Sequence, residues 1–136
     1  MEKIYVKNLN DANPLYISFK NSNPGIGKLK IRAYGANEAV PISGLRIIVS
    51  TIYDDIMFVF FDGYTNDSGI VEKIELPTPK YDSDDLVIPK SITYVVDAIY
   101  SYDKSEQEFN VNMYDGVCVL QNISIIPSIK ERENGN

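Results

Sequence analysis

Apolar and polar side chains alternate along several stretches of this chain, most clearly between residues 28 and 33. One face of that stretch is apolar and the other is basic: Leu29, Ile31 and Ala33 alternate with Lys28, Lys30 and Arg32. Phe109, Val111 and Met113 alternate with Asn110 and Asn112 in the same way. A period of two is typical of a half-buried β-strand. Both stretches therefore predict strands that turn one face toward a core.

The rest of the chain predicts further short strands separated by turns. Strand candidates occupy residues 4–6, 15–19, 45–51, 57–61, 70–76, 92–100 and 117–126. Turns are indicated at Asp54-Asp55, from Thr65 to Gly69 and from Tyr114 to Gly116, and Pro77 is expected to end the strand before it. No window has convincing helical periodicity. Many short strands with regular turns predict an all-β sandwich or a small barrel.

Composition divides the chain into three parts. Residues 1–25 are an N-terminal extension that contains two strand candidates and ends in the turn signal Asn21 to Gly25. The compact core is expected to start near Gly27, and residues 130–136 are a polar tail. With 136 residues, 44% of them hydrophobic, the chain is long enough to bury one core.

The net charge is −6, and this argues against a nucleic-acid partner, because such binding depends on Lys and Arg replacing the counterions of phosphates. The basic residues are scattered, and the row Lys28, Lys30 and Arg32 is the one local cluster. A solvated strand face is the favoured interpretation of this row. A binding patch for an anionic polymer such as teichoic acid is the alternative.

The chain has no histidine and one cysteine, which excludes Ser-His-Asp and Cys-His catalytic sites and any zinc site that contains histidine. A single cysteine cannot form an internal disulfide. The N-terminus lacks the apolar segment of a signal peptide, and no apolar run reaches membrane-spanning length. We therefore expect cytoplasmic synthesis and no membrane partner.

Acidic side chains offer a weak candidate for a calcium site at Asp82, Asp84 and Asp85, because calcium prefers oxygen ligands and often uses Asp-x-Asp spacing. The segment lacks the glycine-pivoted loop and distal glutamate of an EF-hand, so a solvated acidic loop is favoured. Two carboxylates at suitable separation could also cleave a glycan by acid/base catalysis. The sequence does not place any two of them together.

Tyrosine and cysteine are the remaining candidates for binding or reactivity. Tyr94, Tyr100 and Tyr102 follow one another along the predicted strand 92–100 and just beyond it, where aromatic rings stack on sugars or pack across strands. Packing is favoured, because the chain has no Trp. Cys118 lies in an apolar strand without a nearby cation, so we expect a buried, unreactive side chain.

The order of several motifs resembles that of transthyretin-like, carboxypeptidase-regulatory-like (prealbumin-like) domains. These motifs are Gly27 to Tyr34, Ala39 to Ile47, Thr65 to Ile70, Ile92 to Ala98, Phe109 to Val111, Tyr114 to Val117 and Asn122 to Pro127. They are similar to a subset in spore-forming bacteria that lies beside spore cortex-lytic and other peptidoglycan-active domains. The chain departs from the pattern at Ser101-Tyr102, where the family commonly has Gly-Tyr, and we expect no catalytic domain within its 136 residues.

The resemblance spans roughly residues 26–129. It implies that this part is an immunoglobulin-like or prealbumin-like β-sandwich of about seven strands that serves as an accessory module. Hydroxyisourate hydrolase, an enzymatic branch of the wider fold, uses histidines and a C-terminal Tyr-Arg-Gly-Ser, and this chain has neither. We therefore expect no enzymatic activity and no cofactor. The resemblance implies a spore-associated module that binds a protein partner or the cell-wall and spore-cortex matrix, and open strand edges would allow it to form homo-oligomers.

Three other functions remain open at this stage. The first is a regulatory or chaperone-like domain for a cortex-lytic enzyme supplied on another chain. The second is a structural component of a phage or secreted particle. The third, and least favoured, is a glycosidase that uses Asp and Glu alone.

Overall fold

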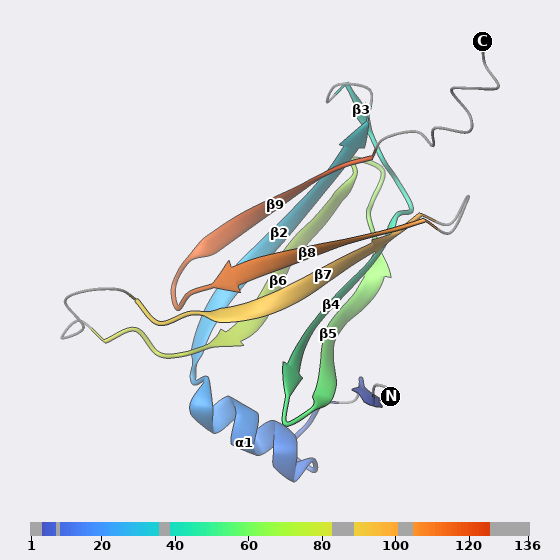
Figure 1. Ribbon diagram of the computed structural model, residues 1–136. Coiled ribbons are helices and arrows are strands. Elements are labelled where there is room, and N and C mark those ends of the chain that lie inside the picture. The colour runs from blue at the N-terminus through green and yellow to red at the C-terminus, as the bar shows by residue number, and fades with distance from the viewer. Residues whose placement is uncertain (1–3, 8, 36–38, 83–88, 101–104, 126–136) are drawn as a thin grey trace.

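A computed structural model of the chain describes residues 4–7, 9–35, 39–82, 89–100 and 105–125, which form two packed β-sheets with one helix at an end (Figure 1). The elements are β1 (Ile4–Val6), α1 (Pro14–Ser22), β2 (Gly25–Gly35), β3 (Val40–Pro41), β4 (Arg46–Tyr53), β5 (Ile56–Tyr64), β6 (Ile70–Thr78), β7 (Ile92–Ile99), β8 (Glu106–Met113) and β9 (Cys118–Ser124). The predicted all-β sandwich is confirmed. The described residues form nine strands, two more than the expected seven or so, because β1 and β3 add short strands.

The five-stranded sheet has the order β1-β5-β4-β7-β8, and the four-stranded sheet joins β6, β3 and β9 to the central strand β2. β4 lies between β5 and β7. β9 runs parallel to β2, from the pair Lys28 and Cys118 to the pair Tyr34 and Ser124. The last strand of the sandwich therefore lies beside one of its first strands, where it completes the four-stranded sheet.

The core lies between the two sheets and follows the period-two pattern of the sequence. Fully buried side chains come from both layers: Leu29, Ile31, Ala33 and Leu76 from the four-stranded sheet, and Ile47, Val49, Phe58 and Val96 from the five-stranded sheet. On β8, Val111 and Met113 are buried while Asn110 and Asn112 are exposed. The predicted faces of the strands at 28–33 and 109–113 are thus confirmed.

The strand predicted over residues 15–19 is wrong, because Pro14–Ser22 forms helix α1. Asn13 caps this helix, and its side-chain oxygen accepts hydrogen bonds from the backbone N–H groups of Leu15 at 3.0 Å and Tyr16 at 3.4 Å. Pro14 occupies the first turn, where its missing N–H costs no hydrogen bond. The pair Asn13-Pro14 is therefore a helix start.

Phe19 anchors α1 to the sandwich. It is the one buried residue of the helix, with 1% of its surface exposed. Its ring centre lies 5.3 Å from that of Tyr53, 5.5 Å from that of Phe58 and 5.7 Å from that of Phe60. The helix thus covers the end of the core where β4 and β5 meet (Figure 1).

The turns behave as their residues predict, but Pro77 does not end its strand. Asp54 and Asp55 form the β4–β5 hairpin with φ angles of 53° and 62°, and Gly69 has φ of 74° before β6. β6 continues through Pro77, opposite Ile26, to Thr78. β6 is an edge strand, and an edge accommodates proline because one side of its backbone bonds to no neighbouring strand.

The prediction that Cys118 is a buried core residue is wrong, because its side chain is exposed. In the parallel register it lies beside Lys28, which also faces outward, while the next residue, Val119, packs against the core. The apolar run around Cys118 does not alternate, so its sequence alone could not assign the faces.

Candidate functional site

The tyrosines predicted as binding candidates do not form an exposed face. Tyr94 is fully buried, and its hydroxyl donates a hydrogen bond to the carbonyl oxygen of Pro77 at 2.6 Å. Burial raises the pKa of the Tyr94 phenol. Tyr100 is half-buried against the core, and Tyr102 lies outside the described residues. Tyr94 is therefore excluded as a residue that stacks on a ligand, because its face of β7 is the core face.

The candidate calcium ligands are described only in part. Asp82 is exposed, and Asp84 and Asp85 lie outside the described residues. Within the described ranges, no three acidic or cysteine side chains gather as a metal site would require. No described helix is long and apolar enough to cross a membrane.

The basic row Lys28, Lys30 and Arg32 lies on the outer face of β2, as the alternation predicts. Lys28 and Arg32 are exposed and Lys30 is half-buried. Among the described residues these three cations form no ion pair within 4.0 Å, whereas the guanidinium of Arg32 lies 5.1 Å from the Tyr34 ring centre. Glu75 lies opposite Lys28 on the neighbouring strand β6, also on the outer face.

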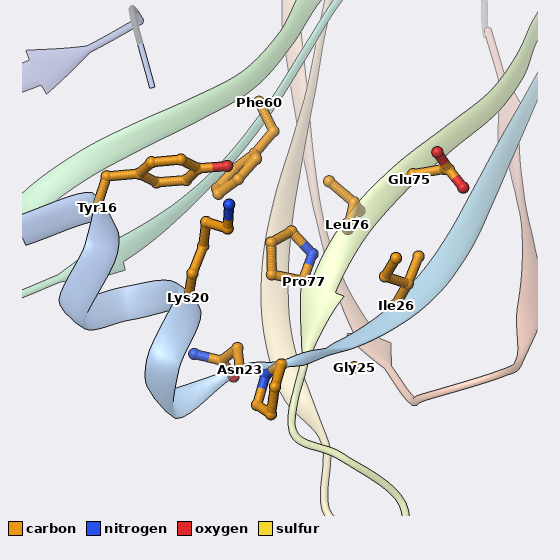
Figure 2. Close-up of a pocket in the computed structure, with 10 residues that line it drawn as sticks. Tyr16, Lys20, Asn23, Gly25, Ile26, Phe60, Glu75, Leu76 and Pro77 are labelled. Atoms are coloured by element: carbon orange, nitrogen blue, oxygen red, sulfur yellow. The ribbon is translucent and has the colours of Figure 1, made fainter. Parts of the chain in front are cut away.

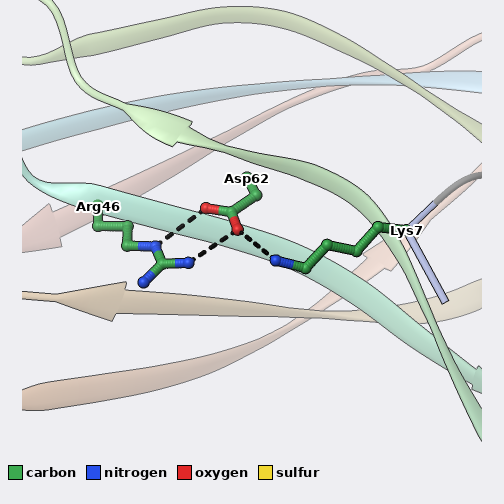
Figure 3. A network of polar contacts seen from close by, with 3 residues as sticks. All are labelled: Lys7, Arg46 and Asp62. Carbon is green, nitrogen blue, oxygen red and sulfur yellow. Dashed lines mark hydrogen bonds and ion pairs between the residues drawn. The ribbon is translucent and has the colours of Figure 1, made fainter. Parts of the chain in front are cut away.

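A network of three charges joins β1 to the neighbouring strands of its sheet (Figure 3). Asp62 accepts two hydrogen bonds from Arg46, at 3.0 and 2.9 Å, and one from Lys7 at 3.0 Å. The hydrogen bonds from Arg46, together with those from Lys7, lower the pKa of Asp62 to about 2. This carboxylate stays ionised near neutral pH and acts as a structural acceptor. No local sequence pattern indicates this network, because Lys7 and Asp62 are 55 positions apart.

A second structural carboxylate, the half-buried Asp115, lies in the turn between β8 and β9. It accepts hydrogen bonds from the backbone N–H of Tyr81 at 2.9 Å and of Ile26 at 3.1 Å. These two N–H groups hold the pKa of Asp115 below its usual range. The turn predicted at Tyr114 to Gly116 therefore also fastens the starts of β2 and β9 together.

A pocket of about 260 Å³ lies where α1 meets β5 and β6 (Figure 2). Its walls combine aromatic, aliphatic and charged side chains, among them Tyr16, Lys20, Phe60, Glu75 and Pro77. Lys20 lies 5.3 Å from the Tyr16 ring centre, and Figure 2 shows it at the opposite end from Glu75. The pocket is smaller than most small-molecule sites. Its charged groups do not converge on one point as an acid/base pair would.

The edges of the two sheets differ in how they are protected against strand addition. Natural edges are blocked by short length, charge or proline. β1 has three residues, β8 carries Glu106 and Glu108, and β6 carries Pro77 besides three charged side chains. β9 reads Cys-Val-Leu-Gln-Asn-Ile-Ser over seven residues and has neither a charge nor a proline. Within the described part of the chain, β2 is its one partner strand.

The ladder between β2 and β9 identifies the backbone groups that face the free side of β9. The carbonyl oxygen of Val117 accepts from the N–H of Lys28, and the N–H of Ile125 donates to the carbonyl oxygen of Tyr34. Odd-numbered residues of β9 thus face β2, and even-numbered residues face away, because backbone groups alternate along a strand. The free side carries the N–H and C=O groups of Cys118, Leu120, Asn122 and Ser124. Leu120 is also 51% exposed.

Comparison with known proteins gives a fold and no family. No protein-family model matches the chain, and no curated protein sequence matches it. Among solved structures it is similar to the Bacillus anthracis TIE protein, with a TM-score of 0.50 and 18% identity over 74% of this chain and 16% of that protein. This likeness supports the sandwich fold alone.

Two further solved structures show weaker similarity. The minor pilin of Streptococcus agalactiae has a TM-score of 0.49 and 14% identity, over 76% of this chain and 46% of the pilin. Klebsiella pneumoniae 5-hydroxyisourate hydrolase has a TM-score of 0.42 and 9% identity, over 73% of this chain and 87% of the hydrolase. The chain therefore spans less than half of the TIE protein and of the pilin.

Proposed function

We propose that this β-sandwich is a non-catalytic interaction module that binds an extended segment of a protein partner along the free side of β9. The observation that carries the proposal is the absence of charge and proline over all of β9, in contrast to the other described edges. An edge without such protection is a template for an added strand.

Strand addition at β9 has enough contact to give measurable affinity. Four residues present N–H and C=O groups on this side, of which the carbonyl oxygen of Asn122 accepts a hydrogen bond from the Gln121 side chain at 2.9 Å. Each hydrogen bond made in water contributes about 0.5 to 1.5 kcal/mol. The exposed side chain of Leu120 adds apolar contact. Together these terms oppose the cost of ordering the incoming segment, and their surplus over that cost is the affinity.

The basic row on β2 favours an anionic partner. Lys28, Lys30 and Arg32 lie one strand away from β9, in register with Cys118, Leu120 and Asn122. Long basic side chains reach across one strand spacing of about 4.8 Å. An added strand with acidic outward residues is therefore preferred over a basic one, although the chain as a whole is acidic.

A heptapeptide, Thr-Val-Glu-Val-Glu-Val-Thr, tests the proposal, with a Lys version in place of Glu as its charge control. Titration into labelled protein should slow amide hydrogen exchange at Leu120 and Asn122, which face the free side. Asn122→Pro removes a free-side N–H without breaking the ladder to β2, so it should weaken binding about tenfold, which corresponds to one hydrogen bond.

Asn122→Ala is the matched control, because it keeps the N–H. If neither peptide protects the β9 amides at millimolar concentration, strand addition at β9 is wrong. Equal loss of binding in the Pro and Ala variants would assign the effect to the Asn side chain, which also contradicts the proposal.

The cell-wall and spore-cortex matrix is the second partner that we propose, and the basic row supports it because such matrices contain anionic polymers. Co-sedimentation with purified peptidoglycan, with and without attached teichoic acid, separates this partner from a protein. Replacement of Lys28, Lys30 and Arg32 by Gln should abolish sedimentation. Retention of the Gln variant in the pellet would exclude the basic row as the contact.

A further inference from the structure

We infer that the strand added to β9 is β8 of a second copy of this chain, in a reciprocal pair that joins the open sides of two sandwiches. The inference rests on the proposed function, because it uses the same free side of β9. It adds the identity of the partner, the symmetry of the complex and the register of the strands.

Opposite charges flank the two strands. The strand beside β9 is β2, which carries the basic row on its outer face. The outer face of β8 carries Glu106 and Glu108, which are both exposed. These glutamates protect β8 from pairing with another β8, because like charges face each other in such a pair. The same glutamates match the cations beside β9. Pairing of β9 with β9 of another copy instead brings two basic rows together.

The backbone groups of the two strands also match. Tyr100 donates its N–H to the carbonyl oxygen of Ser105, so odd-numbered residues of β8 face β7 and even-numbered residues face the free side. The free side of β9 also carries even-numbered residues. On both strands these residues turn their side chains outward from the sandwich, as the exposure of Asn110 and Leu120 illustrates. An antiparallel pair of the two strands therefore aligns hydrogen-bonding groups and side-chain faces together.

The topology places both strands on one open side of the sandwich. β8 is an edge of one sheet, β9 is an edge of the other, and residues 114–117 join them (Figure 1). They run in opposite directions, because β9 returns from the turn in which β8 ends. We place a twofold axis parallel to the strands, between the open sides of the two copies. Rotation about this axis puts the four-stranded sheet of one copy in the layer of the other copy's five-stranded sheet, and it leaves the strand directions unchanged. Each β8 then meets the β9 of the other copy in an antiparallel pair, and the interface closes as an isologous dimer.

Charge selects the register. With Glu108 of one copy opposite Leu120 of the other, Glu106 lies opposite Asn122 and Asn110 lies opposite Cys118. In this register Glu108 of one copy is two strand spacings from Lys30 of the other copy. The backbones of these two residues are about 10 Å apart, and the two long side chains together can span that distance. Each dimer contains the contact twice.

Sedimentation equilibrium over a range of protein concentrations tests the dimer. The wild-type mass should rise from 15.3 kDa toward twice that value. Lys30→Glu and Glu108→Lys should each raise the dissociation constant roughly tenfold, because each replaces two weak attractions by repulsions. The double variant should restore the wild-type constant. Lys20→Glu, on helix α1 outside both sheets, is the matched control and should leave the constant unchanged.

Cross-linking tests the register. The exposed Cys118 of one copy should form a disulfide with Asn110→Cys of the other under mild oxidation, because backbones of paired strands are about 5.5 Å apart at such positions. Asn112→Cys should cross-link more slowly, and Cys118→Ser should abolish the Asn110→Cys product.

A chain that stays monomeric at millimolar concentration overturns the inference. If the heptapeptide nevertheless protects the β9 amides, the proposed strand addition stands and the partner is an acidic strand of another protein. If neither charge variant raises the dissociation constant of the dimer, or if the double variant fails to restore it, the pairing of β8 with β9 is wrong.

Discussion

Replacement of Phe19 by Ala should destabilise the sandwich by about 3 to 4 kcal/mol, although the residue belongs to a short helix near the N-terminus. Phe19 has 1% of its surface exposed and contacts the rings of Tyr53, Phe58 and Phe60. Loss of a fully buried Phe side chain removes its apolar burial and leaves a cavity, which together cost about 3 to 5 kcal/mol. The lower part of that range applies, because α1 can shift into the space.

Urea unfolding followed by far-UV circular dichroism and tyrosine fluorescence measures this effect, since the chain has no Trp. With an m-value near 2 kcal/mol/M, the midpoint should fall by about 1.5 to 2 M. Ile17→Ala is the control on the same helix: Ile17 is 39% exposed, so its midpoint should change by less than about 0.3 M. Equal midpoints for the two variants would refute Phe19 as the anchor of α1.

Three further measurements check other parts of the structure. Asp62→Asn should lose about 1 kcal/mol at pH 6, because the bidentate contact with Arg46 is charge-assisted but solvent-exposed. The folded pKa of Asp62 lies at about 2, below its unfolded value, so the difference from wild type should disappear between pH 4 and 2; a constant difference would contradict the ion pair. Tyr94→Phe should cost about 1 to 2 kcal/mol in urea unfolding, because the carbonyl of Pro77 loses a buried donor; a cost near zero would refute this. In dilute native protein a bulky thiol reagent should label Cys118 about as fast as in unfolded protein, and labelling that requires unfolding would contradict its exposure.

Local pattern predicted the strands well where apolar and polar residues alternate. Leu29, Ile31 and Ala33 are buried as their spacing requires, and Gly69 has the positive φ that its turn needs. The pattern failed at Pro14 to Ser22, where Asn13 and Pro14 are compatible with both a turn and a helix start. Leu15, Tyr16 and Phe19 do have helical spacing, but over nine residues this signal is weak.

The candidate surfaces depend on contacts that no local pattern contains. The sequence identified the basic row Lys28, Lys30 and Arg32 as one face of a strand, but not which strand would lie beside it. It indicated an apolar strand around Cys118 and predicted the wrong face for the cysteine. It offered Tyr94 as a residue of a binding face, whereas that face is the core.

The sequence pattern by itself thus determined the all-β class, with a sandwich or a small barrel as its architecture, because alternation and turn residues act within a few positions of the chain. Tertiary structure decided which strands became edges, which side of β9 stayed open, and which charges met, as Lys7 and Asp62 do across 55 positions. The physical reason is that strand pairing joins distant segments. A backbone group on β9 is free or bonded according to the strand that lies beside it, whatever its own side chain is.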